Sequence, residues 1–150
     1  MKEYSIFYAD DDEDDLMFFE EAITSISGDA AAKINLFLLK NGENLLDTIV
    51  QSNKANNIVF MDLNMPIKSG FEHLEDIRSN KGFSTIPVIM YSTSSDKNNM
   101  EKSKSLGANY YAVKPNSFSD LKKIITKAIS LDFFTETAPP NDFLFNKLAI

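Results

Sequence analysis

The sequence contains no cysteine and no tryptophan, and it has one histidine in 150 residues. Without cysteine the chain can form no disulfide, thiolate metal site or thiolate nucleophile, a composition that fits a reducing compartment. Basic residues are also scarce: 15 lysines and arginines face 22 aspartates and glutamates, and the formal net charge is −7. A general nucleic-acid binder or a protein that binds an anionic membrane needs a basic face, so this charge argues against both classes.

Long apolar runs are missing as well. No stretch approaches the ~20 apolar residues needed to span a bilayer, and the N-terminus has no basic-then-apolar signal region. We therefore expect a cytoplasmic protein. With 43% hydrophobic and 25% charged residues, the chain has the composition of a soluble globular protein with a single core. The lone histidine, His73, is expected to be a surface residue rather than a phosphohistidine centre.

Strand-like and helix-like segments alternate along the chain. Short apolar runs indicate five buried strands, at Tyr4–Ala9, Ile34–Leu39, Ile58–Met61, Ile86–Tyr91 and Tyr110–Val113. After each run, apolar residues recur at spacings of three and four, which predicts helices. These helices are expected from Glu13 to about Ile26, around 45–50, from near Gly70, after the capping residue Asp96, and around 121–129. The alternation predicts an α/β fold, a doubly wound five-stranded parallel sheet covered on both faces.

Four of the apolar runs end on residues suited to hold a phosphoryl group and its metal. The first ends on the acids Asp10–Asp12, the third on Asp62, the fourth on Ser92 and Thr93, and the last on Lys114. In an open parallel sheet, ligands bind just outside the carboxyl ends of the strands. We therefore expect carboxylates, a hydroxyl and an amine to meet at one edge, where the oxygens would suit a hard divalent cation.

Each of these residues also has an ordinary structural interpretation. Carboxylates are favoured at a helix N-terminus, which suffices for Asp12–Asp15, with Asp12 as a plausible N-cap. Asp10 and Asp11 lie directly against an apolar run, where clustered carboxylates repel one another unless a cation is present. A capping role is unsuited to Asp62, because the next helix does not begin until near Gly70. Ordinary structural roles at all four strand ends together would be a coincidence, so one shared site is the better explanation.

In combination these residues resemble the response-regulator receiver domain of two-component signalling, of the chemotaxis-regulator type. The resemblance covers roughly Lys2 to Leu131 and is carried by Ala9–Asp10–Asp11, Met61–Pro66 with Gly70, Ser92, and Val113–Lys114–Pro115. It implies a flavodoxin-like (βα)5 fold with strand order 2-1-3-4-5. Residues 1–131 would form the receiver domain.

The resemblance also implies roles for the acidic residues. Asp62 would be the phosphoacceptor in a Mg²⁺-dependent reaction. Asp11 and Asp62 would bind Mg²⁺ through their side chains and Asn64 through its backbone carbonyl, with Asp10 helping directly or through water. The chain would catalyse only its own phosphoryl transfer and hydrolysis, so it is not expected to be an enzyme in any other sense.

Further implied roles concern switching and partners. Ser92 and Lys114 would contact the phosphoryl oxygens by moving closer, and the bond between Lys114 and Pro115 is usually cis in this family. This movement would let the aromatic switch residue Tyr111 turn inward. A sensor histidine kinase or a histidine phosphotransfer protein would supply the phosphoryl group, and the output would be docking to an effector protein, with a homodimer possible and no direct binding of nucleic acid or membrane.

Other classes of protein fit some of the same residues. An aspartyl-nucleophile phosphatase needs a second Asp two residues after the nucleophile as general acid, where this chain has Asn64. A flavodoxin-like electron carrier needs a phosphate-binding loop after the first strand, where Asp10–Asp15 would repel a flavin phosphate. A degenerate receiver acting only as a partner-binding module would lack Asp62, the acidic pair or Lys114, and this chain has all of them.

Residues 132–150 form an apolar appendage that is too short for a second domain, so no output domain is expected. Large apolar side chains are unusually frequent there, at Phe133, Phe134, Phe143, Leu144, Phe145, Leu148 and Ile150. Disordered segments are poor in such groups. We expect the segment to fold back over an apolar patch of its own domain. The alternative is that it reaches a second copy or a partner, with Pro139–Pro140 as a stiff spacer.

Overall fold

The computed structural model describes residues 2–29, 32–52, 56–131 and 143–145. Its strands are β1 (Lys2–Asp10), β2 (Ala32–Lys40), β3 (Asn57–Met61), β4 (Val88–Ser92) and β5 (Tyr110–Val113). Its helices are α1 (Glu13–Asp29), α2 (Leu45–Ser52), α3 (Gly70–Ser79), α4 (Lys97–Ser105) and α5 (Phe118–Ser130). All neighbouring strands are parallel, in the order β2-β1-β3-β4-β5. The predicted fold class and strand order are confirmed.

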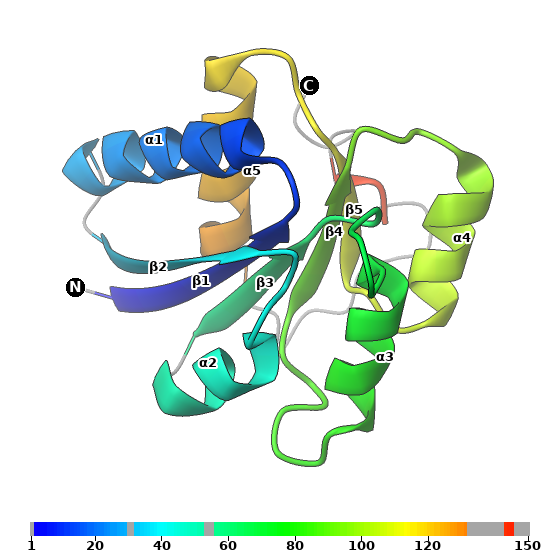
Figure 1. Cartoon of the computed structure of the whole chain (residues 1–150). Helices are drawn as coiled ribbons and strands as arrows, with labels where there is room; N and C mark the ends of the chain where they lie inside the picture. Colours follow the sequence, from blue (N-terminus) through cyan, green and yellow to red (C-terminus); the bar gives the residue numbers. More distant parts are fainter. Residues whose placement is uncertain (1, 30–31, 53–55, 132–142, 146–150) are drawn as a thin grey trace.

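The helices cover both faces of the sheet and divide its core into two clusters. Helices α1 and α5 lie together on one face, while α2 and α3 lie on the other (Figure 1). Alternate residues of a strand point to opposite faces, so Tyr8 of β1 packs with α1 and α5, and Phe7 packs with α2 and α3. Strand β1 lies inside the sheet, between β2 and β3, and is buried from Tyr4 to Asp10. Because this apolar strand is buried on both faces, the acidic side chain of Asp10 at its end is buried as well.

Element boundaries follow local chemistry. Strand β4 begins at Val88 rather than at Ile86, because Pro87 has no N–H to donate to the ladder. The Asp96 side chain caps α4 by accepting from the Asn98 N–H, as predicted. Asp12 caps α1 in the same way, accepting from the Asp14 N–H at 2.8 Å. No helix in the described ranges has the length and apolar character needed to cross a bilayer.

The expectation that His73 is a surface residue is wrong. Its side chain is only 8% exposed and packs beneath Gly42, whose φ is +71°. A Cβ at Gly42 would lie 2.7 Å from His73 Nε2, so glycine is needed there for space as well as for backbone conformation. Burial, followed by the charge of Lys68, lowers the pKa of His73. The spacing of His73 from Gly70 and Ile77, both on the buried face of α3, was the signal available in the sequence.

The residues 143–145 lie against β5, as the favoured interpretation of the C-terminal segment predicted. Phe143 and Phe145 are buried, and Leu144 forms an isolated parallel bridge with Tyr111. The other apolar residues of this segment and the Pro139–Pro140 pair lie outside the described residues. The fold-back is therefore confirmed for Phe143–Phe145.

Arg78 at the end of α3 joins segments that lie far apart in sequence. Its guanidinium donates to the carbonyls of Gly107 (2.8 Å), Ser84 (3.1 Å) and Ile86 (2.7 Å). It also donates to Asn109 Oδ1 at 3.0 Å, and that oxygen accepts the Val88 N–H as well. The planar guanidinium thus ties α3 to the segments that precede β4 and β5.

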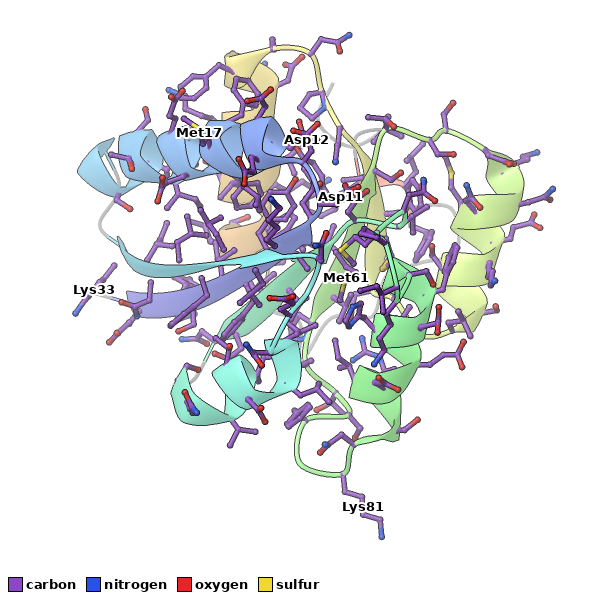
Figure 2. The ribbon with its side chains drawn as sticks, in the orientation of Figure 1. Asp11, Asp12, Met17, Lys33, Met61 and Lys81 are labelled. Atoms are coloured by element: carbon purple, nitrogen blue, oxygen red, sulfur yellow. The ribbon has the colours of Figure 1, made fainter. Side chains whose placement is uncertain are left out.

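Replacing this guanidinium should destabilise the protein. Arg78→Lys keeps the charge but removes the planar set of donors, leaving partly buried carbonyls without partners. We expect a loss of roughly 2–3 kcal/mol in the free energy of unfolding, measured by urea denaturation. Lys81→Ala is the control, because Lys81 extends into solvent (Figure 2) and should change stability by less than about 0.5 kcal/mol. Equal stabilities of the two variants would contradict this role.

Candidate metal centre

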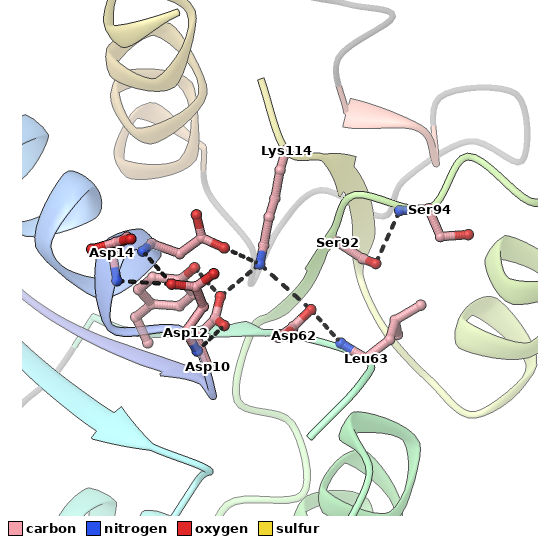
Figure 3. A network of polar contacts seen from close by, with 10 residues as sticks. Asp10, Asp12, Asp14, Asp62, Leu63, Ser92, Ser94 and Lys114 are labelled. Atoms are coloured by element: carbon pink, nitrogen blue, oxygen red, sulfur yellow. Dashed lines mark hydrogen bonds and ion pairs between the residues drawn. The ribbon is translucent and has the colours of Figure 1, made fainter. Parts of the chain in front are cut away.

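The structure brings the four strand ends together at the carboxyl edge of the sheet (Figure 3). The Asp62 N–H donates to the Ala9 carbonyl at 3.0 Å, and the Lys114 N–H donates to the Ser92 carbonyl at 2.8 Å. Each bond continues the strand ladder by one residue past the end of β3 or β5. The backbone thereby aims these side chains at one place.

Three carboxylates form the acidic part of the site. Asp10, Asp11 and Asp62 each offer an oxygen, and these oxygens lie within 4.8 Å of one another. Asp10 and Asp62 are buried, while Asp11 is exposed at the mouth of the site (Figure 2). Oxygen donors at this spacing suit a hard divalent cation that keeps some of its water.

Lys114 places a cation beside the carboxylates of Asp10, Asp15 and Asp62. Its Nζ lies 2.7 Å from Asp10 Oδ2, 2.9 Å from Asp15 Oδ2 and 3.6 Å from Asp62 Oδ1. Only 9% of its side chain is exposed, and the ammonium lies 5.6 Å from the centroid of the Tyr91 ring. Burial by itself would lower the pKa of Lys114, but hydrogen bonds to Asp10 and Asp15 outweigh it and raise this pKa to about 12.

Asp10 is held as a fixed anion. Its Oδ1 accepts the Asp12 N–H at 3.0 Å, and its Oδ2 accepts both the Tyr8 hydroxyl and the Lys114 ammonium. Burial would raise the pKa of Asp10, but the hydrogen bonds from Lys114, Tyr8 and the Asp12 amide leave it lower than usual. Asp10 therefore has fewer free lone pairs for a metal than Asp11 or Asp62.

Asp62 has the opposite electrostatic environment. Its Oδ1 accepts the Leu63 N–H at 2.9 Å and lies 3.6 Å from Lys114 Nζ, and one of its oxygens lies within 4.8 Å of carboxylate oxygens of Asp10 and Asp11. Burial, with the charges of Asp10 and Asp11, raises the pKa of Asp62 to about 7, although Lys114 acts to lower it. A cation bound to the cluster would favour the ionised form, because an opposite charge stabilises a carboxylate.

The loop after Asp62 depends on Gly70. A Cβ at Gly70 would lie 2.0 Å from the Asp62 carbonyl oxygen, so only glycine permits this approach of α3 to the strand end. The Gly70 N–H closes the loop by donating to the Leu63 carbonyl at 2.9 Å. Asn64, predicted to offer its carbonyl to the metal, lies in this loop and is exposed.

Ser92 and Tyr111 form a polar connection on the other side of the site. Ser92 is buried, and its Oγ accepts the Ser94 N–H at 3.2 Å. The Tyr111 hydroxyl donates to the Ser94 carbonyl at 2.8 Å, and the whole residue is 0% exposed. The Tyr111 ring therefore lies inward in this structure, and its inward turn on phosphorylation stays a prediction.

The structure differs from the sequence-based expectations at one peptide bond, and it adds two residues to the site. The Lys114–Pro115 peptide bond is trans, since the described residues contain no cis peptide bond. Asp15 is more than a solvated helix-start acid, because it pairs with Lys114. The role of Tyr8 was also missed, although its place two residues before Asp10 on one strand puts both side chains on the same face. For Asp15 the signal is weak, since its position depends on the angle at which α1 leaves β1.

Comparison with known proteins decides the family. Residues 6–126 match the family profile of the response regulator receiver domain. The chain belongs to this family. Receiver domains are phosphoacceptor signalling switches of two-component systems and bind divalent metal at an acidic cluster of this kind. Receiver domains interact with histidine kinases and phosphotransfer proteins in two-component systems.

Several relatives are similar over most of the receiver domain. Response regulator Rcp1 of Synechocystis is 31% identical over 103 residues, which are 69% of this chain and 66% of the relative. Chemotaxis protein CheV2 of Helicobacter pylori is 33% identical over 92 residues, which are 60% of this chain and 29% of the relative. The chain thus spans less than two thirds of these curated relatives.

Solved structures agree with the fold. The Mn²⁺-bound form of response regulator Rcp1 has a TM-score of 0.70 and 26% identity, and the match covers 91% of this chain and 99% of that one. The phosphorylated cyanobacterial phytochrome response regulator RcpA has a TM-score of 0.70 and 25% identity, covering 83% of this chain and 90% of that one. Both are response regulators, and their similarity supports the receiver fold described above.

The burial of Asp62 and the negative charges beside it lead to a stability prediction. Above pH 7 the buried carboxylate is ionised and destabilises the metal-free fold, and this penalty fades as the pH falls through the raised pKa of about 7. Asp62→Asn should therefore raise the free energy of unfolding at pH 8 in EDTA, by on the order of 2 kcal/mol, and by less at pH 5. Urea denaturation of both proteins at both pH values measures this difference.

Asp47→Asn is the matched control for this measurement. Asp47 is exposed on α2, so its replacement should change the free energy of unfolding little at either pH. An Asp62→Asn protein that is less stable than the wild type at pH 8 would show that the acidic cluster does not strain the fold.

Proposed function

We propose that Asp62 is the phosphoacceptor of this receiver domain, that Mg²⁺ is the physiological cation, and that residues 1–131 act as the signalling unit through protein–protein docking. The observation that supports this most strongly is the constellation at the strand ends. A buried carboxylate with a raised pKa lies within reach of two further carboxylates and 3.6 Å from a lysine ammonium. We further propose a cytoplasmic location.

The donor in this proposal is a phosphohistidine on a sensor kinase or a histidine phosphotransfer protein. An Asp62 carboxylate oxygen attacks phosphorus, an O–P bond forms, and the P–N bond to the imidazole breaks, with the leaving imidazole taking up a proton. A bound Mg²⁺ neutralises the anionic partners and supplies electrostatic stabilisation. Asp11 and Asp62, with the Asn64 carbonyl, would hold it, and Asp10 would act mainly through Lys114 and water.

The remaining side chains would stabilise the acyl phosphate once it forms. Lys114 can donate to a phosphoryl oxygen by moving from its present partners Asp10 and Asp15 toward Asp62. The Ser92 hydroxyl shares a hydrogen bond with the Tyr111 hydroxyl, and by turning away from it could donate to another phosphoryl oxygen while Oγ still accepts the Ser94 N–H. The change of charge at Asp62 is thereby transmitted to the loop that follows β4.

Labelling with acetyl phosphate tests the acceptor directly. In Mg²⁺, intact mass should increase by one phosphoryl group in the wild type and in Asp12→Asn, whose side chain caps α1 without joining the acidic cluster. Asp62→Asn should show no increase, and EDTA should abolish labelling of every protein. Full labelling of the Asp62→Asn protein would refute the assignment, and no labelling of the wild type would favour a degenerate receiver that only binds partners.

Metal binding tests the acidic cluster separately. Asp11→Asn should weaken Mg²⁺ affinity about tenfold or more in calorimetric titrations, because it removes a charged ligand beside the cation. Asp12→Asn again serves as the control, since it removes one carboxylate from the neighbouring position but not from the cluster. Equal losses in both variants would indicate that net charge, rather than direct ligation by Asp11, governs affinity.

A further inference from the structure

The residues Phe143–Phe145, here called the latch, close the outer edge of β5. The Tyr111 N–H donates to the Phe143 carbonyl at 2.9 Å, and Leu144 forms the parallel bridge with Tyr111. In the sheet order β5 is an edge strand, and an exposed edge carries unpaired backbone groups that invite pairing. The latch satisfies part of this edge within the chain itself.

The latch also contacts both faces of the sheet. Phe143 joins the core cluster that contains Tyr111, whereas Phe145 joins the opposite cluster that contains Tyr110. A regular strand would put both aromatic rings on one face, so the backbone crosses the edge between them. The Phe145 and Tyr110 ring centroids are 4.9 Å apart, and Lys127 Nζ lies 4.5 Å from the Phe145 centroid.

Tyr111 connects the latch to the candidate phosphoryl site. Its backbone binds Phe143, and its hydroxyl binds the Ser94 carbonyl in the loop that also contacts Ser92. The Tyr111 ring has no exposed surface while Phe143 occupies the same cluster. An outward swing of the ring would therefore have to displace Phe143, because a close-packed interior leaves no room for both.

We propose that docking of the latch on β5 and phosphorylation of Asp62 favour each other through Tyr111. The inference rests on the proposed function of Asp62. A phosphoryl oxygen that draws Ser92 inward moves the Ser92–Ser94 loop toward Asp62 and holds the Tyr111 hydroxyl inward with it. The inward ring is the conformation that leaves the Phe143 site intact. The latch is docked in this structure, so phosphorylation would stabilise the docked latch further and loss of the phosphoryl group would weaken its contact with the β5 edge.

Thermodynamic linkage requires the effect to be reciprocal. If a phosphoryl group tightens latch docking by some factor, a docked latch must tighten binding of a phosphoryl mimic by the same factor. This reciprocity gives two independent readouts on the full chain. One is amide hydrogen exchange at Leu144 and Phe145, and the other is the affinity for beryllofluoride in the presence of Mg²⁺.

In the wild type, beryllofluoride should slow exchange at Leu144 and Phe145 by about fivefold or more, a typical size for allosteric coupling. Tyr111→Phe removes the hydroxyl that binds Ser94 but keeps the ring, so the latch should stay docked. The factor by which beryllofluoride slows amide exchange should then fall toward one. Phe145→Ala loosens the latch from the face opposite Tyr111 and should weaken beryllofluoride affinity by the same factor of about five.

Fluorine NMR of bound beryllofluoride separates the two proposals. A bound signal in the wild type with unchanged or faster exchange at Leu144 and Phe145 overturns the latch proposal alone. The absence of a bound signal overturns the proposed role of Asp62, and the latch proposal with it. A Phe145→Ala protein with wild-type beryllofluoride affinity also overturns the coupling, because the reciprocal effect would then be missing.

Discussion

The site depends on one buried charge, the ammonium of Lys114. It lies within 3.6 Å of oxygens from Asp10, Asp15 and Asp62, and its side chain is nearly inaccessible to water. Without it, the carboxylates at the strand ends would repel one another in a poorly solvated place. The ammonium does not neutralise all of them, and burial together with the remaining negative charge raises the pKa of Asp62 to about 7. Receiver domains bind a divalent metal at an acidic cluster of this kind, and a bound cation would offset the remaining negative charge.

The fold makes this arrangement possible by placing rigid apolar strands immediately before the reactive residues. Central strands buried on both faces fix the carboxyl edge of the sheet, and the glycine at the start of α3 lets that helix approach Asp62 closely. Tyr111 connects this edge to the latch. Its hydroxyl donates to the Ser94 carbonyl in the loop after β4, and its backbone N–H donates to the Phe143 carbonyl of the latch. A charge change at Asp62 therefore has a short physical path to the β5 edge.

Much of this could be predicted from the sequence because its signals are local. The limits of β5, the Asp96 cap and the convergence of the strand ends follow from apolar runs, turn chemistry and parallel topology. The errors arose where tertiary packing decides. His73 is buried because α3 turns it beneath Gly42, and Asp15 pairs with Lys114 because α1 leaves β1 at a particular angle. The inward Tyr111 depends on its contact with Ser94, across a distance that no spacing in the sequence encodes.

The most direct test of the central claim identifies the modified residue itself. The full chain is phosphorylated with acetyl phosphate, its acyl phosphate is reduced with borohydride, and the product is mapped by tandem mass spectrometry. The account predicts one modified position, Asp62, which appears in Mg²⁺ and disappears in EDTA. Modification at Asp10 or Asp11 instead, or modification of Asp62 that is indifferent to the metal, would contradict it.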